Sequence, residues 1–432
     1  MQNTSKEEVP VLAAFLHQPQ SMQELGIPQS LVIDILLRLF YNEGNVNFGR
    51  MSQVMRVPMV MEPLLDWMRQ ERLIEVNQNS AAVGPFNYIY KLTDLGMARA
   101  RGALDRSQYV GPVPVSVDQY CRAIEMQTMG PRKVSASEMQ AVLSDLVLPA
   151  DFHRSVGPAV NSAASLFLYG PSGNGKTTIA QRIARLIAGM DPIWLPYAIS
   201  AGGQIIQIHD RLFHNYVEGD KKRDNEHIDG RWALYRRPSV IVGGELKMDA
   251  LDLRFDPVAK IYEAPLQLKA NGGMFLIDDF GHQQVTPGDL LNRWIVPLEN
   301  GLDYLRLRTG QTIVVPFRAF VIFSTNLNPY DLADDAFYRR IQMKVGVFSP
   351  DEARFRQIFL KACGLMGMLF DEASYAHLLD KWYRQPERPF QAVHPRDIVT
   401  IVQSLCLYEG VEPGLTPERI DEACASYFVK GK

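Results

Sequence analysis

The chain has 432 residues, of which 47% are hydrophobic and 22% are charged, and its formal net charge is −3. This composition is typical of a globular protein of two to four domains, and the charge gives no reason to expect a protein that coats nucleic acid or anionic membranes. The four cysteines are widely spaced and the first twenty residues lack the features of a signal peptide, so we expect neither a disulfide framework nor a zinc site, but a cytoplasmic protein without a membrane span.

Residues 1–112 show the pattern of a small helical domain that ends in two strands and a last helix. The helical and strand-like runs span residues 30–40, 48–55, 59–72, 73–76 and 88–92. Thr93 and Asp94 are typical of the start of the last helix. This order of three helices and a two-stranded ribbon resembles a winged-helix domain.

Winged-helix domains often read DNA with their third helix, which corresponds to residues 59–72. A base-reading helix is usually basic on its outer face. The residues that decide the charge of this helix are Arg69 and Arg72 against Glu62, Asp66 and Glu71. We therefore favour a protein-contact or structural role for the N-terminal domain and keep DNA binding as an alternative.

A Gly- and Pro-containing linker at residues 109–114 follows, and helical pieces are predicted within residues 113–160. The chain then reaches the pattern G-x-x-x-x-G-K-[ST] at residues 170–177, between an apolar run at 165–169 and a helical pattern at 178–187. The glycines allow the backbone to wrap a phosphate at positive φ, and the helix N-terminus faces the anion. The predicted nucleotide contacts are Gly170, Pro171, Ser172, Gly173, Asn174, Gly175, Lys176, Thr177 and Thr178.

Within this loop Lys176 is expected to reach the β- and γ-phosphates of a nucleotide, and Thr177 to bind Mg²⁺. A second motif follows at residues 274–279, where four apolar residues precede two acids. A buried strand that ends in a carboxylate presents that group to a metal ion and to water. We assign Asp278 to the metal and Asp279 to the attacking water.

A further apolar strand at residues 318–325 ends in Asn326, whose amide is expected to orient water beside the γ-phosphate. Paired arginines, Arg339 and Arg340, come shortly afterwards. The order of phosphate loop, hydrophobic-Asp-Asp, a strand ending in Ser-Thr-Asn, and then Arg-Arg-Ile resembles an AAA+ ATPase over residues 145–430.

The resemblance implies an α/β fold: a P-loop core with a parallel sheet between helices, a helical lid, and the winged-helix-like α+β domain in front. It implies that Asn326 matches sensor 1 and that Arg339 or Arg340 matches the arginine finger, which acts on ATP held by a neighbouring subunit. It therefore implies a homo-oligomeric, most often hexameric, ring. An arginine at that place offsets transition-state charge.

The alternation of apolar and polar residues over 302–315, with a turn at Thr309 and Gly310, predicts a β-hairpin. Its position resembles the pre-sensor-1 hairpin of the MoxR-like, magnesium-chelatase and enhancer-activator branches. The Gly-Ala-Phe-Thr-Gly-Ala loop of the enhancer activators is absent. The family's usual second motif is Asp-Glu, so Asp279 is one methylene shorter than the usual residue. We expect active hydrolysis, either slow or helped by an adjustment of the backbone, and keep an ATP-bound switch as the alternative.

A second core strand is expected within residues 192–199, and residues 200–257 are expected to be an extra stretch with a strand or hairpin at 202–210. In AAA+ rings this region lies near the central pore; a solvated surface insertion is the alternative. The histidines of this stretch have no metal-ligand spacing.

From Ser349 onward the pattern predicts a helical lid, with Ser349 and Glu352 as a capping box. Arg396 lies at the start of the third lid helix, where its location resembles sensor 2; the alternative is a salt bridge to Asp397. The expected domains are residues 1–112, 113–160, 161–348 and 349–432. The sequence thus predicts an Mg²⁺- and ATP-dependent ring that remodels a protein complex, with a client or adaptor bound through the N-terminal domain.

Overall fold

The computed structural model describes residues 8–77, 88–130, 133–162, 165–217, 228–327 and 341–428. The chain forms two compact units, each assembled from separate stretches. The first unit comprises Met1–Gly130, Ile187–Phe275 and Asn292–Phe320, and the second comprises Pro131–Leu186, Leu276–Leu291 and Val321–Lys432. Among the described residues, no helix combines the length and the apolar character needed to cross a bilayer.

The N-terminal part of the first unit is a group of helices with a small antiparallel sheet. Its helices are α1 (Glu8–Phe15), α2 (Gln29–Glu43), α3 (Phe48–Met55), α4 (Pro58–Gln70) and α5 (Asp94–Arg106). Its strands, in the order β1-β3-β2, are β1 (Val46–Asn47), β2 (Ile74–Val76) and β3 (Ile89–Leu92). Helices α2 to α5 and strands β2 and β3 lie where the sequence predicts them.

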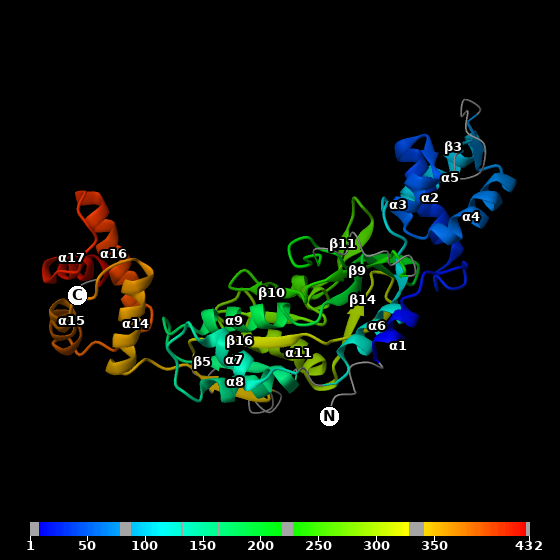
Figure 1. Ribbon diagram of the computed structural model, residues 1–432. Coiled ribbons are helices and arrows are strands. Elements are labelled where there is room, and N and C mark those ends of the chain that lie inside the picture. The colour runs from blue at the N-terminus through cyan, green and yellow to red at the C-terminus, as the bar shows by residue number, and fades with distance from the viewer. Residues whose placement is uncertain are drawn as a thin grey trace. The chain divides into compact units, whose positions relative to one another are not determined.

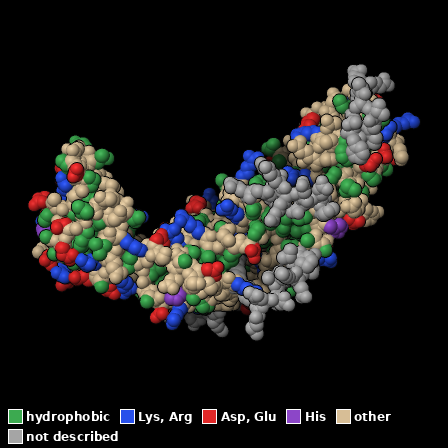
Figure 2. All heavy atoms as spheres, viewed as in Figure 1, with side chains coloured by type: hydrophobic (Ala, Val, Ile, Leu, Met, Phe, Trp, Pro, Cys, Tyr) green, Lys and Arg blue, Asp and Glu red, His purple; other side chains and the backbone are tan. Residues whose placement is uncertain are grey.

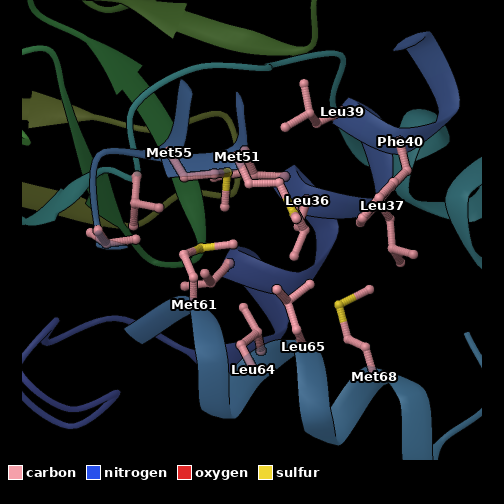
Figure 3. Packing of buried hydrophobic residues seen from close by; sticks show 14 of the residues in the cluster. Leu36, Leu37, Leu39, Phe40, Met51, Met55, Met61, Leu64, Leu65 and Met68 are labelled. Atoms are coloured by element: carbon pink, nitrogen blue, oxygen red, sulfur yellow. The ribbon is translucent and has the colours of Figure 1, made fainter. Parts of the chain in front are cut away.

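The core of this part is made by one face of each helix. Figure 3 shows Leu36 and Phe40 of α2, Met51 and Met55 of α3, and Leu65 of α4 pointing toward one another, and all five are buried. Burying each such side chain stabilises the fold by about 1.5–3 kcal/mol relative to leaving it exposed. The flexible methionines fill the irregular space between the helices.

The start of α5 is fixed by its cap and by one close approach. The Thr93 hydroxyl accepts a hydrogen bond from the backbone N–H of Gly96 at 3.0 Å, as predicted for a cap at this position. A Cβ atom on Gly96 would lie 1.9 Å from the carbonyl oxygen of Leu73. Only glycine therefore allows α5 to pack this closely against Leu73, the residue directly before β2.

The remainder of the first unit is built from three further sheets. The largest has the strand order β11-β12-β8-β7-β4, with β4 (Val115–Ser116), β7 (Ala198–Ala201), β8 (Gln204–Gln207), β11 (Arg254–Asp256) and β12 (Ile261–Glu263). Two antiparallel pairs are β6 (Ile193–Pro196) with β9 (Trp232–Tyr235) and β14 (Leu302–Arg306) with β15 (Thr312–Pro316). The pair β14–β15 confirms the hairpin predicted over residues 302–315. Residues 202–210 contain one strand, β8, which pairs with β7 outside that range.

A buried ion pair fastens the start of this region to the N-terminal segment. The guanidinium of Arg231 donates to the carboxylate of Asp229 at 2.7 Å, and the two side chains are only 2% and 4% exposed. The same guanidinium donates to the carbonyl oxygens of Leu25 and Pro114 at 3.1 and 3.3 Å. Each of these contacts of the cation is therefore a charge-assisted hydrogen bond made away from water.

The central sheet has the strand order β10-β13-β16-β5-β17. Its strands are β5 (Leu166–Tyr169), β10 (Ser239–Val242), β13 (Met274–Ile277), β16 (Phe320–Thr325) and β17 (Met343–Gly346). Both β16 and β17 run parallel to β5, with Ile322 and Met343 opposite Leu166. All residues of β13 and β16 are buried, as is usual for parallel strands covered on both faces.

Helices flank this sheet, which confirms the α/β fold class (Figure 1). The helices outside the lid and the N-terminal part are α6 (Val117–Thr128), α7 (Ala136–Leu143), α8 (Phe152–Ser162), α9 (Lys176–Ala188), α10 (Leu266–Lys269) and α11 (Pro287–Asn300), with a short 3₁₀ turn at Met248–Leu251.

Two expectations about the core sheet are wrong. The run at residues 192–199 supplies no core strand, because β6 ends at Pro196 and the chain enters a different sheet at β7. The strand beside β13 is instead β10, which lies within residues 200–257. That stretch is therefore not merely an addition to the core, since it provides one of the five strands.

Residues 349–428, which we call the lid, are helical as predicted. They contain α14 (Glu352–Leu365), α15 (Glu372–Leu379), a π-helical turn at Asp380–Arg384, α16 (His394–Glu409) and α17 (Pro417–Tyr427). The expected cap of the first helix is wrong, because Asp351, and not Ser349, accepts the hydrogen bond from the N–H of Arg354.

Candidate functional site

The loop between β5 and α9 has the backbone that its glycines predict. Gly170, Gly173 and Gly175 have φ values of 136°, 77° and 88°, which L-residues rarely adopt. A Cβ atom on Gly170 would also lie 2.3 Å from the carbonyl oxygen of Val347. The backbone shape of the loop therefore requires glycine at these positions. The loop leads directly into the N-terminus of α9, where backbone N–H groups favour an anion.

Lys176 is the first residue of α9, and its ammonium lies inside the loop. Its Nζ donates to the carbonyl oxygens of Gly170 and Pro171 at 2.8 and 3.0 Å, and the side chain is 7% exposed. Burial lowers the pKa of Lys176, while the nearby carboxylates of Asp279 and Asp278 oppose that shift. The cation therefore lies at the centre of the loop, within reach of an anion that the loop encloses.

Thr177 and Asp278 meet although they are far apart in the sequence. The Thr177 hydroxyl donates to Oδ2 of Asp278 at 2.7 Å. Oδ1 of Asp278 is buried and has no hydrogen-bond partner among the described residues. An oxygen pair of this kind, one hydroxyl and one carboxylate with a free lone pair, is the donor set that Mg²⁺ prefers.

The residue after Asp278 is exposed and has an unusual backbone. Asp279 has φ of 49°, in the left-handed region that Asp tolerates better than most residues. The turn that follows is fixed to the end of β16, because the N–H of Phe280 donates to Ser324 O and the Thr325 hydroxyl donates to Phe280 O, both at 2.7 Å. Asn326 comes next in the chain and is exposed at the same edge of the sheet.

Two residues of this turn were not expected from the sequence. Oδ1 of Asn326 lies 3.0 Å from Nε2 of His282. Gln283 donates to the carbonyl oxygens of both Asp278 and Asp279 at 3.0 Å and accepts from the N–H of Gly281 at 2.8 Å. Their sequence signal is Gly281 followed by polar residues, two positions after the paired acids, which predicts a turn but no partner.

The phosphate loop also contacts the lid through Asn174, which is 5% exposed. The side chain of Asn174 accepts from the N–H of Ala392 at 3.1 Å and donates to Oγ of Ser349 at 3.3 Å. The N–H of Val393 donates to Gly173 O at 2.9 Å, one residue before α16 begins. Ser349, which the sequence assigned to a cap, thus contacts the loop instead.

Among the described residues, the side chains of the remaining predicted site residues make no hydrogen bond to Lys176, Thr177 or Asp278. Arg396 lies in the first turn of α16, where its guanidinium donates to Asp397 at 3.1 Å and is 69% exposed. Pro171 and Ser172 within the loop, and Thr178 directly after it, are exposed. Arg339 and Arg340 lie outside the described residues.

Comparison with known proteins gives limited matches. The family model described as a domain of unknown function (DUF8689) matches residues 351–426, which lie within the lid. No curated protein matches the chain. Solved structures that resemble it include NtrX from Brucella abortus in complex with ADP, with a TM-score of 0.42 and 14% identity over 78% of this chain and 67% of that chain. A second NtrX structure from Brucella abortus has a TM-score of 0.39 and 13% identity over 71% of this chain and 58% of that chain.

Proposed function

We propose that this chain is an ATPase of the AAA+ type that binds Mg²⁺ and ATP. The observation that carries the proposal is the hydrogen bond between Thr177 and Asp278, 2.7 Å long, at the base of a loop that encloses the ammonium of Lys176. A structural Thr–Asp pair needs neither a buried lysine above it nor a carboxylate oxygen without a partner. A nucleotide and its metal ion satisfy both groups.

In this proposal Lys176 and the loop N–H groups bind the phosphates, and Thr177 and Asp278 bind Mg²⁺, which offsets phosphate charge when it is bound. Asp279 and Asn326 lie on the exposed side of the same strand ends and orient the attacking water. Arg396 can reach the γ-phosphate only if its bond to Asp397 breaks. In this proposal it contacts the γ-phosphate when a nucleotide is bound.

We further propose that the chain acts as a homo-oligomeric ring that remodels a protein complex. The hairpin β14–β15 supports this, because Tyr304 and Val314 on its two strands are 51% and 44% exposed and offer apolar surface to a client. Arg339 or Arg340 would act on the nucleotide of a neighbouring subunit.

The surface charge of α4 supports a protein partner, rather than DNA, for the winged-helix-like domain. Glu62, Asp66 and Arg69 are exposed on α4, and Arg69 pairs with Asp66 at 3.6 Å. Figure 2 shows acidic and basic side chains interspersed on the visible face of this part of the chain. A helix that reads DNA needs uncompensated positive charge, so steeply salt-dependent DNA binding by this domain would overturn the assignment.

The proposal is tested by ATP binding and phosphate release with Mg²⁺ across protein concentration. We expect Lys176→Ala to abolish both activities. Lys361→Ala is the matched control, because that exposed lysine also donates to a backbone carbonyl, Ser144 O at 3.1 Å. Specific activity that rises with concentration and is lost in an Arg339→Ala/Arg340→Ala variant supports the ring, and a Lys176→Ala variant that still binds ATP refutes the site.

The exposed, left-handed Asp279 favours one alternative, an ATP-bound switch that hydrolyses slowly. Asp279→Glu lengthens the side chain to that of the usual AAA+ residue. A glutamate at this positive φ lowers the stability of the fold by about 1–2 kcal/mol. Steady phosphate release by the wild type that is lost in Asp279→Asn rules the switch out. ATP binding without turnover in both proteins supports it.

A further inference from the structure

The turn between Asp278 and Gln283 is held in one shape by bonds to both of its ends. Gln283 bonds three backbone groups of the turn, and Gly281 supplies a φ of 104° that no other residue type adopts readily. Two bonds fix the turn against the end of β16: the N–H of Phe280 donates to Ser324 O, and the Thr325 hydroxyl donates to Phe280 O. Residue 282 is therefore presented at a defined place beside the end of β16.

The side chain at that place is His282, and it lies against Asn326. The separation of 3.0 Å joins Nε2 of His282 to Oδ1 of Asn326. Because the amide oxygen can only accept, Nε2 must carry the hydrogen. With the hydrogen on Nε2, the bond holds the Asn326 amide with its oxygen toward His282 and leaves the NH₂ group as the donor on the other side.

We infer that His282 is a positioning residue that aims the Asn326 amide at the attacking water or the γ-phosphate. This inference rests on the proposed ATPase function. Both side chains are exposed, and among the described residues the bond to His282 is the hydrogen bond that the Asn326 amide makes. An amide rotated by half a turn would present its oxygen to a phosphate and repel it. A donor is required there because the transferring phosphoryl group carries negative charge on its oxygens.

The expected effect is on turnover rather than on nucleotide affinity. Loss of one hydrogen bond that sets orientation lowers kcat for phosphate release by about 3- to 10-fold. The affinity for ADP stays within twofold of wild type, because the loop and Lys176 bind the two phosphates that ADP has. His282→Gln keeps an N–H donor at similar reach and restores most of the rate, whereas His282→Phe keeps the ring and does not.

The experiment is a double-mutant cycle that combines His282→Ala with Asn326→Ala, with ADP affinity measured for each protein. The cycle separates a residue that acts through Asn326 from one that acts independently. The matched control is His153→Ala on α8, because within the described part of the chain the His153 ring bonds the local carbonyl of Ala150 at 3.0 Å and no side chain. A second readout is the trapping of ADP with aluminium fluoride, which mimics the transferring group without any turnover.

We expect the double variant to be as slow as Asn326→Ala alone, and trapping to weaken in His282→Ala but not in the control. Losses that multiply, a full rate in His282→Ala, or a change confined to ADP affinity would each overturn the inference while leaving the ATPase proposal intact. A wild type that neither hydrolyses ATP nor traps the mimic overturns both. A wild type that traps the mimic without turnover still decides the question, since His282→Ala then traps it less.

Discussion

Asp278→Asn is expected to make the metal-free protein more stable and to make the nucleotide-bound protein less stable. The Thr177 hydroxyl donates to one carboxylate oxygen at 2.7 Å, and the asparagine oxygen still accepts that bond. The other oxygen is buried and lacks a partner among the described residues. The substitution converts that charged atom into a neutral NH₂ group, whose burial costs less.

The magnitude follows from the cost of an unpaired buried acceptor, which is about 1–3 kcal/mol and larger when the group is charged. We expect the free energy of unfolding of the metal-free protein to rise by only about 1 kcal/mol. The new NH₂ group is itself without an acceptor, and the substitution also removes the favourable charge interaction between Asp278 and Lys176. Such a change moves the Tm of a domain of this size by about 2–4 °C.

The assay is thermal unfolding with a chelator, and then with Mg²⁺ and ADP. A ligand at a concentration 100 times its Kd stabilises the wild type by about 2.7 kcal/mol, so the order of the two Tm values should reverse. The matched control is Asp289→Asn, because the exposed Asp289 accepts a similar bond from Thr286 at 2.6 Å. A variant that is less stable with chelator, or that keeps the full gain from Mg²⁺ and ADP, would show that Asp278 is a structural residue.

Two further predictions concern the first unit. Arg231→Ala leaves the buried carboxylate of Asp229 unpaired, and we expect the free energy of unfolding to fall by about 3–5 kcal/mol, as measured by urea denaturation; a loss below 1 kcal/mol would contradict the burial argument. His214 accepts from the N–H of Asp210 and donates to Lys269 O, both at 2.9 Å, and burial lowers its pKa to about 4. As the pH falls, the histidine of the unfolded chain binds a proton near pH 6.5, before the folded protein does. The free energy of unfolding should therefore fall as the pH drops from about 6.5 to 4. His214→Gln should flatten that slope in a pH series of Tm values, and an unchanged slope would refute the assignment.

The sequence predicted the phosphate loop because its requirements are local. Glycines at positive φ, a lysine and a threonine at fixed spacing, and the flanking strand and helix all lie within about twenty residues. The cap of α5 at Thr93 and the hairpin β14–β15 were predictable for the same reason. Neither depends on a partner elsewhere in the chain.

The features that were missed depend on long-range partners. The order of strands in the central sheet is not written in the periodicity of any one strand, so an apolar run at 192–199 and the true strand β10 look alike. Ser349 and Asp351 both suit a helix cap, and the choice is made by Asn174, which bonds Ser349. His282 acquires its role only because residue 326 lies beside it.

The hydrogen bonds of Asn174 connect the phosphate loop to two separate points of the lid. Ser349 is where the chain enters the lid, and Ala392 lies just before α16, so one amide side chain bonds both. A lid that swings about this point must break at least one of these bonds, and an anion that moves the loop must strain the same bonds. By thermodynamic reciprocity, whatever stabilises one lid angle changes the affinity of the loop for phosphate by the same factor. A protein that binds only the lid would therefore regulate nucleotide binding without contacting the nucleotide.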